Sequence, residues 1–255
     1  MKLLKFISIF LTCISCHACA DISANDQVKL EKFFEYLIIR TTFGYTLCGE
    51  KPISMETLPN LTKIPAIPMV GIFFKLPGYH ILQKGLETWS KYTKLFPSKN
   101  FVLRFIPEYS TIVLINKKAT LKVIDENLDL FHKLSSPNLS AEEFLAEICQ
   151  PKNKEYMIRS NVTLLGILLG YGRNNAMAFD KKKGIVKMNP FNSNYIDRSL
   201  VKQLEPNFMA LSNKTNYREN KFINKMIEKS KIRIRREFKS KKYFEKFMEL
   251  YANVD

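Results

Sequence analysis

A glycine-rich, almost uncharged stretch ends in three polar residues whose types could bind an anion. Residues 161–179 read NVTLLGILLGYGRNNAMAF and hold three of the nine glycines, followed at once by Arg173, Asn174 and Asn175. Backbone N–H groups exposed by glycines, with an arginine beside them, can hold an anion. One interpretation is therefore a backbone-lined anion site whose candidate binding residues are Arg173, Asn174 and Asn175.

Close packing explains the same stretch without a ligand. Gly166 and Gly170 are four residues apart, and small residues at this spacing share one face of a helix and allow a second helix to approach. No Lys-Ser/Thr pair follows the glycines and no strand is predicted before them, so a nucleotide P-loop and a dinucleotide fingerprint are both excluded. Packing is the favoured interpretation for the first half, and the Arg-Asn-Asn end keeps a claim on function.

The start of the chain has the composition of a secretory signal peptide. Two lysines precede an apolar run over residues 6–14, and residues 18–20 (Ala-Cys-Ala) place small side chains at a cleavage site. We expect cleavage before Asp21 and a periplasmic, envelope-associated or secreted protein. An uncleaved anchor and a lipid anchor at Cys16 or Cys19 are the alternatives. The apolar run is short for a membrane span.

Two cysteines, Cys48 and Cys149, remain beyond that leader. Paired in an oxidising compartment, they would close a loop of about a hundred residues and stabilise the fold by about 4 kcal/mol. The alternative is two separate buried thiols, which we favour slightly because one pair does not make a disulfide framework. No Cys-x-x-Cys motif remains, so zinc and thioredoxin-type sites are excluded.

The histidines beyond the leader, His80 and His132, do not complete a catalytic set. Cys48 with either histidine could form a thiol nucleophile and its base, but neither a nucleophile-elbow spacing nor a positioned carboxylate accompanies them. No H-x-x-x-H or H-x-x-E spacing is present, which disfavours a metal site. We therefore expect no metal and no cofactor, and a non-enzymatic protein rather than an enzyme.

Apolar periodicity predicts an α+β fold, mainly helical with a small antiparallel β-sheet. The clearest strand signal is a hairpin over residues 101–116, FVLRFIPEYSTIVLIN. Two short strands are predicted in residues 45–54 around a Gly49-Glu50 turn, where Glu50 and Lys51 would be solvated. A third short strand is predicted at residues 185–188, followed by a turn at 189–194.

Helical spacing predicts the remaining elements. The predicted helices are residues 26–42 capped by Asn25 or Asp26, residues 79–95, a helix through Leu121 and Phe131, a helix opened by a Ser140–Glu143 capping box, a helix from about Lys154 through the glycine-rich stretch, and a short helix at 199–204. Five prolines in residues 52–77 predict a loop draped over the core.

The C-terminal part is strongly basic. Residues 214–249 hold thirteen Lys and Arg against five Glu, and the difference of +8 is half of the net charge of the whole chain, +16. Apolar residues keep helical spacing through this region, so it is predicted to be a pair of basic amphipathic helices. The candidate basic surface residues are Lys231, Arg233, Arg235, Arg236, Lys239, Lys241 and Lys242.

Three interpretations of this basic region compete. Interleaved aromatic residues would suit nucleic acid, but an exported protein meets nucleic acid only if it is delivered into a host cell. Basic residues beside an apolar face would suit a membrane surface. A solvated charged face over a core-docked stripe is the third interpretation, and it is the favoured one of the three.

Two segments resemble a known group of proteins. GYTLCGEKPIS (Gly44–Ser54) and LLGILLGYGRNNAMAF (Leu164–Phe179) resemble segments of uncharacterised exported proteins of chlamydia-type intracellular bacteria. That group has no established activity, so the resemblance supplies no catalytic residue. It implies that the two segments belong to one structural unit.

These observations predict a signal peptide over residues 1–20, one α+β domain over 21–212 and a basic helical tail over 213–255. The predicted function is an exported, non-enzymatic protein that binds a protein partner or an anionic surface through the basic helices. The alternative function is a hydrolase of envelope or host polymers with a cleft near Gly172–Asn175. That alternative requires an open pocket there with convergent polar groups.

Overall fold

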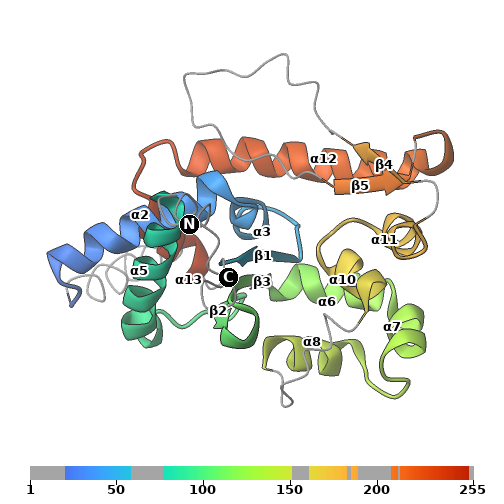
Figure 1. The fold of residues 1–255 in the computed structure, drawn as a ribbon, viewed down its shortest axis with the longest axis horizontal. Coiled ribbons are helices and arrows are strands. Elements are labelled where there is room, and N and C mark those ends of the chain that lie inside the picture. Colours follow the sequence, from blue (N-terminus) through green and yellow to red (C-terminus); the bar gives the residue numbers. More distant parts are fainter. Residues whose placement is uncertain are drawn as a thin grey trace, which may run out of the picture.

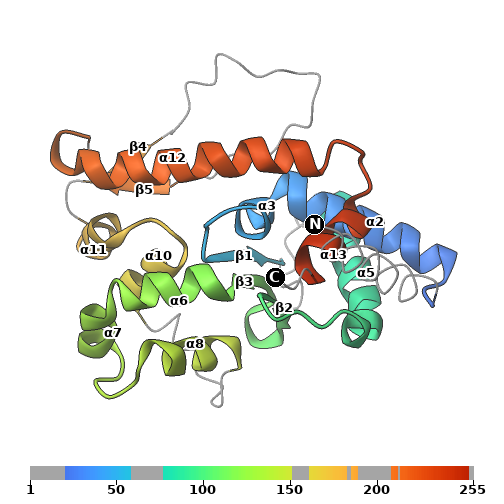
Figure 2. The same ribbon diagram turned by 180° about the vertical axis from the view of Figure 1, so that it is seen from behind.

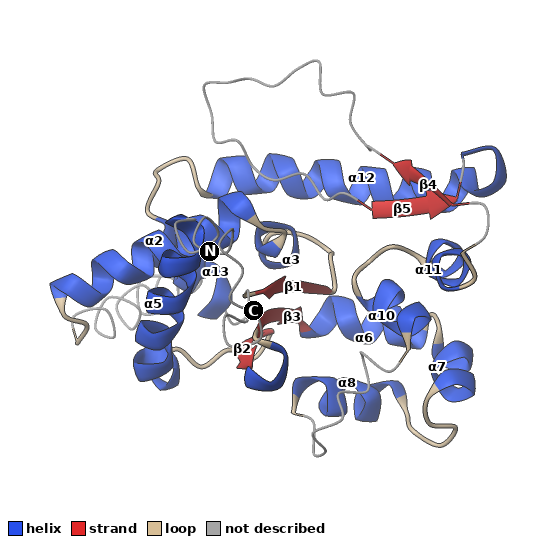
Figure 3. Cartoon of the chain, in the orientation of Figure 1, coloured by secondary structure: helices blue, strands red, loops and turns tan. Residues whose placement is uncertain are grey.

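The computed structural model describes residues 21–58, 77–150, 161–182, 185–188, 208–211 and 213–252. Helices surround a small antiparallel sheet (Figures 1 and 3), which confirms the predicted mainly helical α+β class. The leader, most of the proline-rich loop, the turn at 189–194 and the helix at 199–204 lie outside the described residues.

The three-stranded sheet contains the predicted hairpin. Its strands are β1 (Ile53–Thr57), β2 (Phe101–Ile106) and β3 (Thr111–Asn116), arranged in the order β1-β3-β2 with both pairs antiparallel. The connection between β2 and β3 is a short 3₁₀ turn, η3 (Pro107–Tyr109), followed by Ser110 at a φ of 47°. Because β3 is the central strand, its backbone groups are paired on both sides.

Strand β3 separates two hydrophobic cores. Ile112 and Leu114 belong to the first core, and Val113 and Ile115 belong to the second. Successive side chains of a strand point to opposite faces of the sheet, so the sheet is the wall between the cores. This explains why residues 111–116 form a nearly continuous apolar run instead of an alternating one.

The first core lies between one face of the sheet and five helices. These helices are α2 (Ala24–Arg40), α3 (Phe43–Leu47), α5 (Pro77–Tyr92), α12 (Asn213–Glu237) and α13 (Tyr243–Ala252). Two helices, α12 and α13, are present where a basic pair was predicted, but only α12 is basic, because α13 carries one Lys and two Glu. Both helices contribute buried side chains to this core, so residues 213–252 pack with the N-terminal half of the chain.

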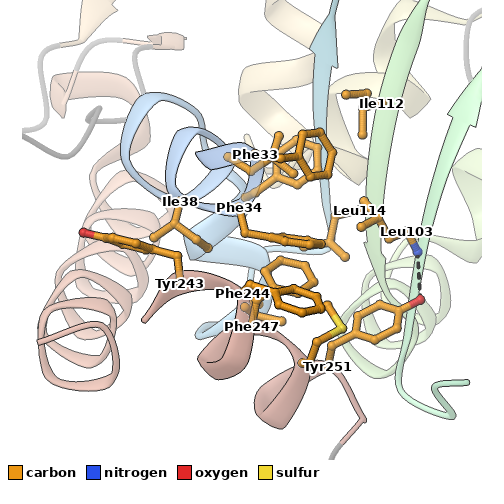
Figure 4. Packing of buried hydrophobic residues seen from close by; sticks show 14 of the residues in the cluster. Phe33, Phe34, Ile38, Leu103, Ile112, Leu114, Tyr243, Phe244, Phe247 and Tyr251 are labelled. Atoms are coloured by element: carbon orange, nitrogen blue, oxygen red, sulfur yellow. Dashed lines mark hydrogen bonds between the residues drawn. The ribbon is translucent and has the colours of Figure 1, made fainter. Parts of the chain in front are cut away.

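Aromatic rings join the first and last described helices (Figure 4). The ring of Phe34 lies 4.3 Å from that of Phe247 and 5.6 Å from that of Phe244, measured between centroids. The carboxylate of Glu31 accepts hydrogen bonds from the N–H groups of Tyr243 and Phe244 at 2.7 and 2.9 Å. Glu31 thereby caps α13, satisfying backbone donors that a helix start leaves unpaired.

The second core lies on the other face of the sheet. It is covered by α6 (Lys117–Asp125), α7 (Leu128–Leu134), α8 (Ala141–Cys149), α10 (Val162–Leu168) and α11 (Arg173–Asp180). In Figures 1 and 2 these helices gather on the side of the sheet away from α2 and α13.

Several local predictions differ from the structure. The first of the two strands predicted in residues 45–54 is absent, because residues 43–47 form α3 with Tyr45 and its neighbours buried in the first core. Thr46 hydrogen bonds to Ser54 across the turn, with 2.7 Å between the hydroxyl oxygens. Lys51 is buried, not solvated, while Glu50 is exposed as expected.

One predicted helix start and one predicted continuous helix also differ from the structure. The N-cap of α2 is Ser23, whose Oγ accepts from Asp26 N at 3.2 Å, so the cap predicted at Asn25 or Asp26 was wrong. The predicted helix through Leu121 and Phe131 is broken into α6 and α7, with Asn127 at the junction.

Three other predicted elements are present. The capping box of Ser140 and Glu143 opens α8, and α5 covers most of the predicted helix at 79–95. The predicted strand β4 (Ile185–Met188) pairs antiparallel with β5 (Phe208–Leu211).

Gly85 marks the closest approach of α2 and α5, and its replacement by alanine should destabilise the fold. A Cβ at this position would lie 2.3 Å from Phe33 Cβ, which is a clash with a buried, immobile atom. Alanine gains about 1 kcal/mol of helix propensity over glycine, but overpacking a core costs about 1–3 kcal/mol. We expect Gly85→Ala to lower the free energy of unfolding by about 1 kcal/mol in urea denaturation, the overpacking cost less the gain in propensity. The neighbouring exposed variant Lys84→Ala should change it by less than about 0.5 kcal/mol; equal stability of the two variants would contradict this account.

Candidate functional site

The glycine-rich stretch forms two helices joined by a turn, not one helix. Asn161 Oδ1 accepts from Leu164 N at 3.0 Å and caps the start of α10. Gly170 and Gly172 then adopt positive φ values of 81° and 83°, a conformation that glycine reaches without steric cost. The prediction of a continuous helix through both glycines was therefore wrong, and its predicted start at Lys154 lies outside the described residues.

Gly166 packs as the helix-packing interpretation expects. A Cβ added at Gly166 would lie 2.8 Å from the Cβ of Ala176, so α10 and α11 meet at this residue. Gly166 is buried in the second core beside Ile167 and Leu168. Gly166 serves the contact between α10 and α11, and the later two glycines form the turn that leads into α11.

The start of α11 is already occupied by a carboxylate of the same chain. Glu219, on α12, accepts hydrogen bonds from the backbone N–H groups of Asn174 and Asn175 at 3.1 and 3.2 Å. These are the donors that an external anion would need. Glycine at 172 leaves room for this side chain, since a Cβ there would lie 2.5 Å from Glu219 Cδ. The predicted anion site at residues 173–175 is thus filled internally.

Asn175 is the centre of a buried polar network. Its side chain is fully buried and donates to Tyr171 O at 2.9 Å and to Asn220 Oδ1 at 3.0 Å. Its Oδ1 accepts from Leu211 N at 2.9 Å and from Asn216 Nδ2 at 3.0 Å. Four hydrogen bonds satisfy the whole amide, and they tie α11 to β5 and α12.

Asn174 and Arg173 are engaged as well. The exposed Asn174 donates from Nδ2 to Asn216 Oδ1 at 3.2 Å. The guanidinium of Arg173 makes a two-pronged ion pair with the carboxylate of Asp129 on α7, at 2.7 and 2.6 Å. This pairing lowers the pKa of Asp129 to about 2, chiefly through the hydrogen bond from Arg173. The convergent polar groups that the hydrolase hypothesis required are present, but they bind one another.

The spacing of the partners was visible in the sequence. Asn216, Glu219 and Asn220 are separated by three and four residues, which places them on one face of a helix. What the sequence did not show is that this face meets the Arg-Asn-Asn segment more than forty positions earlier. Glu219 and Asn216 are therefore site residues that were missed.

Lys51 is a second buried polar group at the junction of the two cores. Its Nζ donates to the carbonyl oxygens of Ile53 and Leu169, the latter at 2.7 Å. Leu169 is the C-cap of α10, so the lysine binds the end of that helix, where a cation is favoured. The contact also joins the segments Gly44–Ser54 and Leu164–Phe179.

No carboxylate among the described residues lies within ion-pair distance of this ammonium, and burial lowers the pKa of Lys51 to about 7. A cavity of about 20 Å³, enough for roughly one water, lies beside it and is also lined by Tyr45, Met226 and Ser230.

Both cysteines are free thiols, so the candidate disulfide is not formed. Cys48 is buried in the first core, and Cys149 is half-buried against the second. The sheet lies between these cores, which explains why the two thiols do not meet. Burial raises the pKa of Cys48 to about 12 and raises that of Cys149, so neither is an activated nucleophile. His132, with Nε2 2.8 Å from Leu139 O, packs with the second core and not near Cys48.

The predicted basic surface residues lie on the outer side of α12 and on the turn into α13. Of the seven, Lys231 is half-buried and the other six are exposed. Arg236 pairs with Glu237 at 2.7 Å and Lys242 with Glu245 at 3.0 Å. The exposed Lys and Arg between residues 218 and 242 are Arg218, Lys221, Lys225, Lys229, Arg233, Arg235, Arg236, Lys239, Lys241 and Lys242.

Large apolar side chains are exposed on the same helix. Phe222 is 59% exposed and Ile232 is 64% exposed, and Tyr217 near the start of α12 is 57% exposed. The opposite stripe of α12 is buried in the first core through Ile223, Ile227 and Ile234. The helix therefore has an apolar inner face and a mixed basic and apolar outer face, and the apolar part of the outer face was not predicted from the sequence.

Comparisons with protein-family models, with curated proteins and with solved structures each gave no match. Within the described ranges, no group of three or more His, Cys, Asp and Glu side chains is arranged to hold a metal ion. Among the helices in that same part of the chain, none combines the length and apolarity that crossing a bilayer requires.

Proposed function

We propose that this chain is an exported, non-enzymatic binding protein that docks on an anionic partner through the outer face of α12 and the turn into α13. We call this surface the basic face; it consists of the ten exposed Lys and Arg between residues 218 and 242. The observation that carries the proposal is the charge imbalance of this surface. Among the described residues 218–242, ten Lys and Arg are exposed, and Glu228 is the one exposed carboxylate. Export is supported by the composition of residues 1–20. If the exported chain were found to keep these residues instead of starting at Asp21, cleavage would be contradicted.

The arrangement of charge on α12 is unfavourable for the isolated protein. Lys221, Lys225, Lys229 and Arg233 follow one another at intervals of four residues and are all exposed. Like charges at this spacing destabilise a helix by about 0.2–0.5 kcal/mol per pair, so three successive pairs cost roughly 1 kcal/mol. A solvated face optimised for stability would alternate sign. An anionic partner would relieve this repulsion, which supports binding as the role of the face.

A rigid support favours the same role. The inner stripe of α12 is packed into the first core, and Glu219, Asn216 and Asn220 fasten its first turns to α11 and β5. The basic side chains are therefore presented on a helix of fixed position, whose regular part after the kink at Asn216 runs for about 30 Å at 1.5 Å per residue. Figure 1 shows α12 along one edge of the molecule.

An equal-charge comparison tests the proposal. The variant K221E/K225E/K229E/R233E reverses four charges on the basic face and keeps the i,i+4 like-charge pattern, so its helix stability should match that of the native chain. The control K84E/K99E/K118E/K133E reverses four exposed lysines on other elements and has the same net charge. At about 1 kcal/mol per basic residue at an anionic surface, heparin affinity should fall on the order of a thousandfold for the first variant and much less for the control.

Binding is measured as the dissociation constant for heparin over a series of salt concentrations, since electrostatic binding weakens with salt. Equal loss of affinity in both variants would mean that net charge alone controls binding, and the proposal would be wrong. No heparin binding by the native chain at low salt would also overturn it.

A further inference from the structure

The exposed apolar residues of α12 are placed among the basic side chains. Phe222 and Ile232 are ten residues apart, about 15 Å along the axis, and both lie on the outer half of the helix. Ile232 follows Lys229 by three residues and precedes Arg236 by four, so basic side chains are its neighbours on the helix surface. An isolated exposed apolar residue is ordinary, but this pair lies on a helix that also carries seven of the ten exposed cations of the basic face.

Other apolar side chains of α12 are buried, which makes the exposure of Phe222 and Ile232 informative. The first core encloses Ile223, Ile227 and Ile234 of the same helix to 5% exposure or less. A core that can bury hydrophobic side chains of α12 is therefore available. Phe222 and Ile232 occupy positions that the fold turns outward, where they gain nothing from folding.

The combination favours a bilayer over other anionic partners. Helices that lie in a membrane surface combine Lys and Arg with apolar side chains that enter the boundary between lipid headgroups and acyl chains. In α12 the main apolar stripe is buried in the first core, so Phe222 and Ile232 are the apolar side chains free to enter. Single-stranded nucleic acid is held in a positive groove with aromatic stacking platforms, whereas the most exposed apolar side chain here, Ile232, is aliphatic and lies on a convex helix surface. Mobile headgroups can also meet basic residues spread over the length of α12 without a fixed pattern.

We propose that the anionic partner is a lipid bilayer carrying anionic headgroups, and that α12 lies along its surface with Phe222 and Ile232 inserted among those headgroups. This inference rests on the proposed function, because it assigns the partner of the basic face. The cations bring α12 to the surface, and the two apolar side chains set its depth.

A tryptophan reporter tests insertion directly. The one native tryptophan, Trp89, is 3% exposed in the first core, so it supplies a constant background. We would place a second tryptophan at the exposed position 232 (Ile232→Trp) and, as a control, at the 37% exposed position 134 on α7 (Leu134→Trp). With vesicles of phosphatidylcholine and phosphatidylglycerol, emission of the first variant should shift to the blue and be quenched by brominated acyl chains. The control variant should show neither change, nor should either variant with phosphatidylcholine alone.

A second variant separates insertion from attraction. F222S/I232S keeps every charge, so its affinity for heparin should remain native, while its partition onto the anionic vesicles should fall by roughly tenfold or more. Unchanged vesicle partition, or quenching equal at positions 232 and 134, would overturn insertion and leave the proposed function standing. Heparin binding without any vesicle binding would exclude lipid as the partner. Loss of neither kind of binding in K221E/K225E/K229E/R233E would overturn the basic face itself.

Discussion

Replacing Asn175 with alanine is expected to lower the free energy of unfolding by about 3 kcal/mol. The change removes one hydrogen bond from each of four groups, Leu211 N, Tyr171 O, Asn216 Nδ2 and Asn220 Oδ1. Asn216 Nδ2 keeps its hydrogen bond to Glu219 at 2.6 Å. Each buried polar group left unpaired costs about 1–3 kcal/mol, moderated where water enters. For a chain of this size the midpoint of thermal unfolding should fall by roughly 6–12 °C.

The adjacent residue is the matched control. Asn174 is exposed, and its side chain makes one hydrogen bond at 3.2 Å, so Asn174→Ala should cost less than about 1 kcal/mol. Both variants are compared by calorimetry and by urea denaturation. A difference below about 0.5 kcal/mol between them would show that the network around Asn175 does not hold α11 to α12.

The second large effect is a rise in stability between pH 7 and 8.5 that depends on Lys51. Burial lowers its pKa to about 7 in the folded chain, whereas lysine in an unfolded chain has a pKa near ~10.4. In this window the unfolded state binds more protons than the native state, so stability rises with pH, by up to about 1.4 kcal/mol per unit. The window stops near pH 8.5 because Cys48, whose pKa burial raises to about 12, contributes the opposite slope above it.

Lys51→Met isolates this contribution. The variant has no titrating group at position 51, so its free energy of unfolding should lose most of the upward slope that the native chain shows over this window. Lys118→Met, at an exposed position on α6, should keep the native slope. Parallel curves for the native chain and Lys51→Met in urea denaturation at several pH values would contradict burial of a charge-carrying amine at this position.

The elements that were predicted correctly are those in which the local sequence preference and the tertiary packing agree. The hairpin of β2 and β3 was predictable because two β-branched and aromatic runs flank a Pro-Glu-Tyr-Ser turn. Residues 43–47 have the same β-favouring composition, but they form α3 because Tyr45 and Leu47 are buried in the first core. Strand propensity mostly reflects how well a side chain fits a half-buried surface. Where a core accepts the same side chains from a helix, the segment can form a helix despite that propensity.

The sequence located the candidate site, but it did not show that side chains of the same chain fill it. The glycines and the Arg-Asn-Asn segment correctly marked a place of close approach, yet the groups that fill it, Glu219 and Asn216, come from a helix predicted separately. Lys51 was placed on a solvated turn because nothing local to residues 49–52 shows that Leu169 arrives beside it. Both errors share one cause. The partner residue lies far away in the sequence, and a single sequence does not show which distant segments come into contact.

Acetylation of lysine amines in the native chain, with and without heparin, tests the central claim most directly. Bound polyanion should protect Lys221, Lys225 and Lys229 from acetylation, measured residue by residue by mass spectrometry. The exposed lysines 84, 99, 118 and 133 should react at the same rate with and without it. Equal protection of the two sets, or protection of the second set alone, would show that α12 is not the docking face.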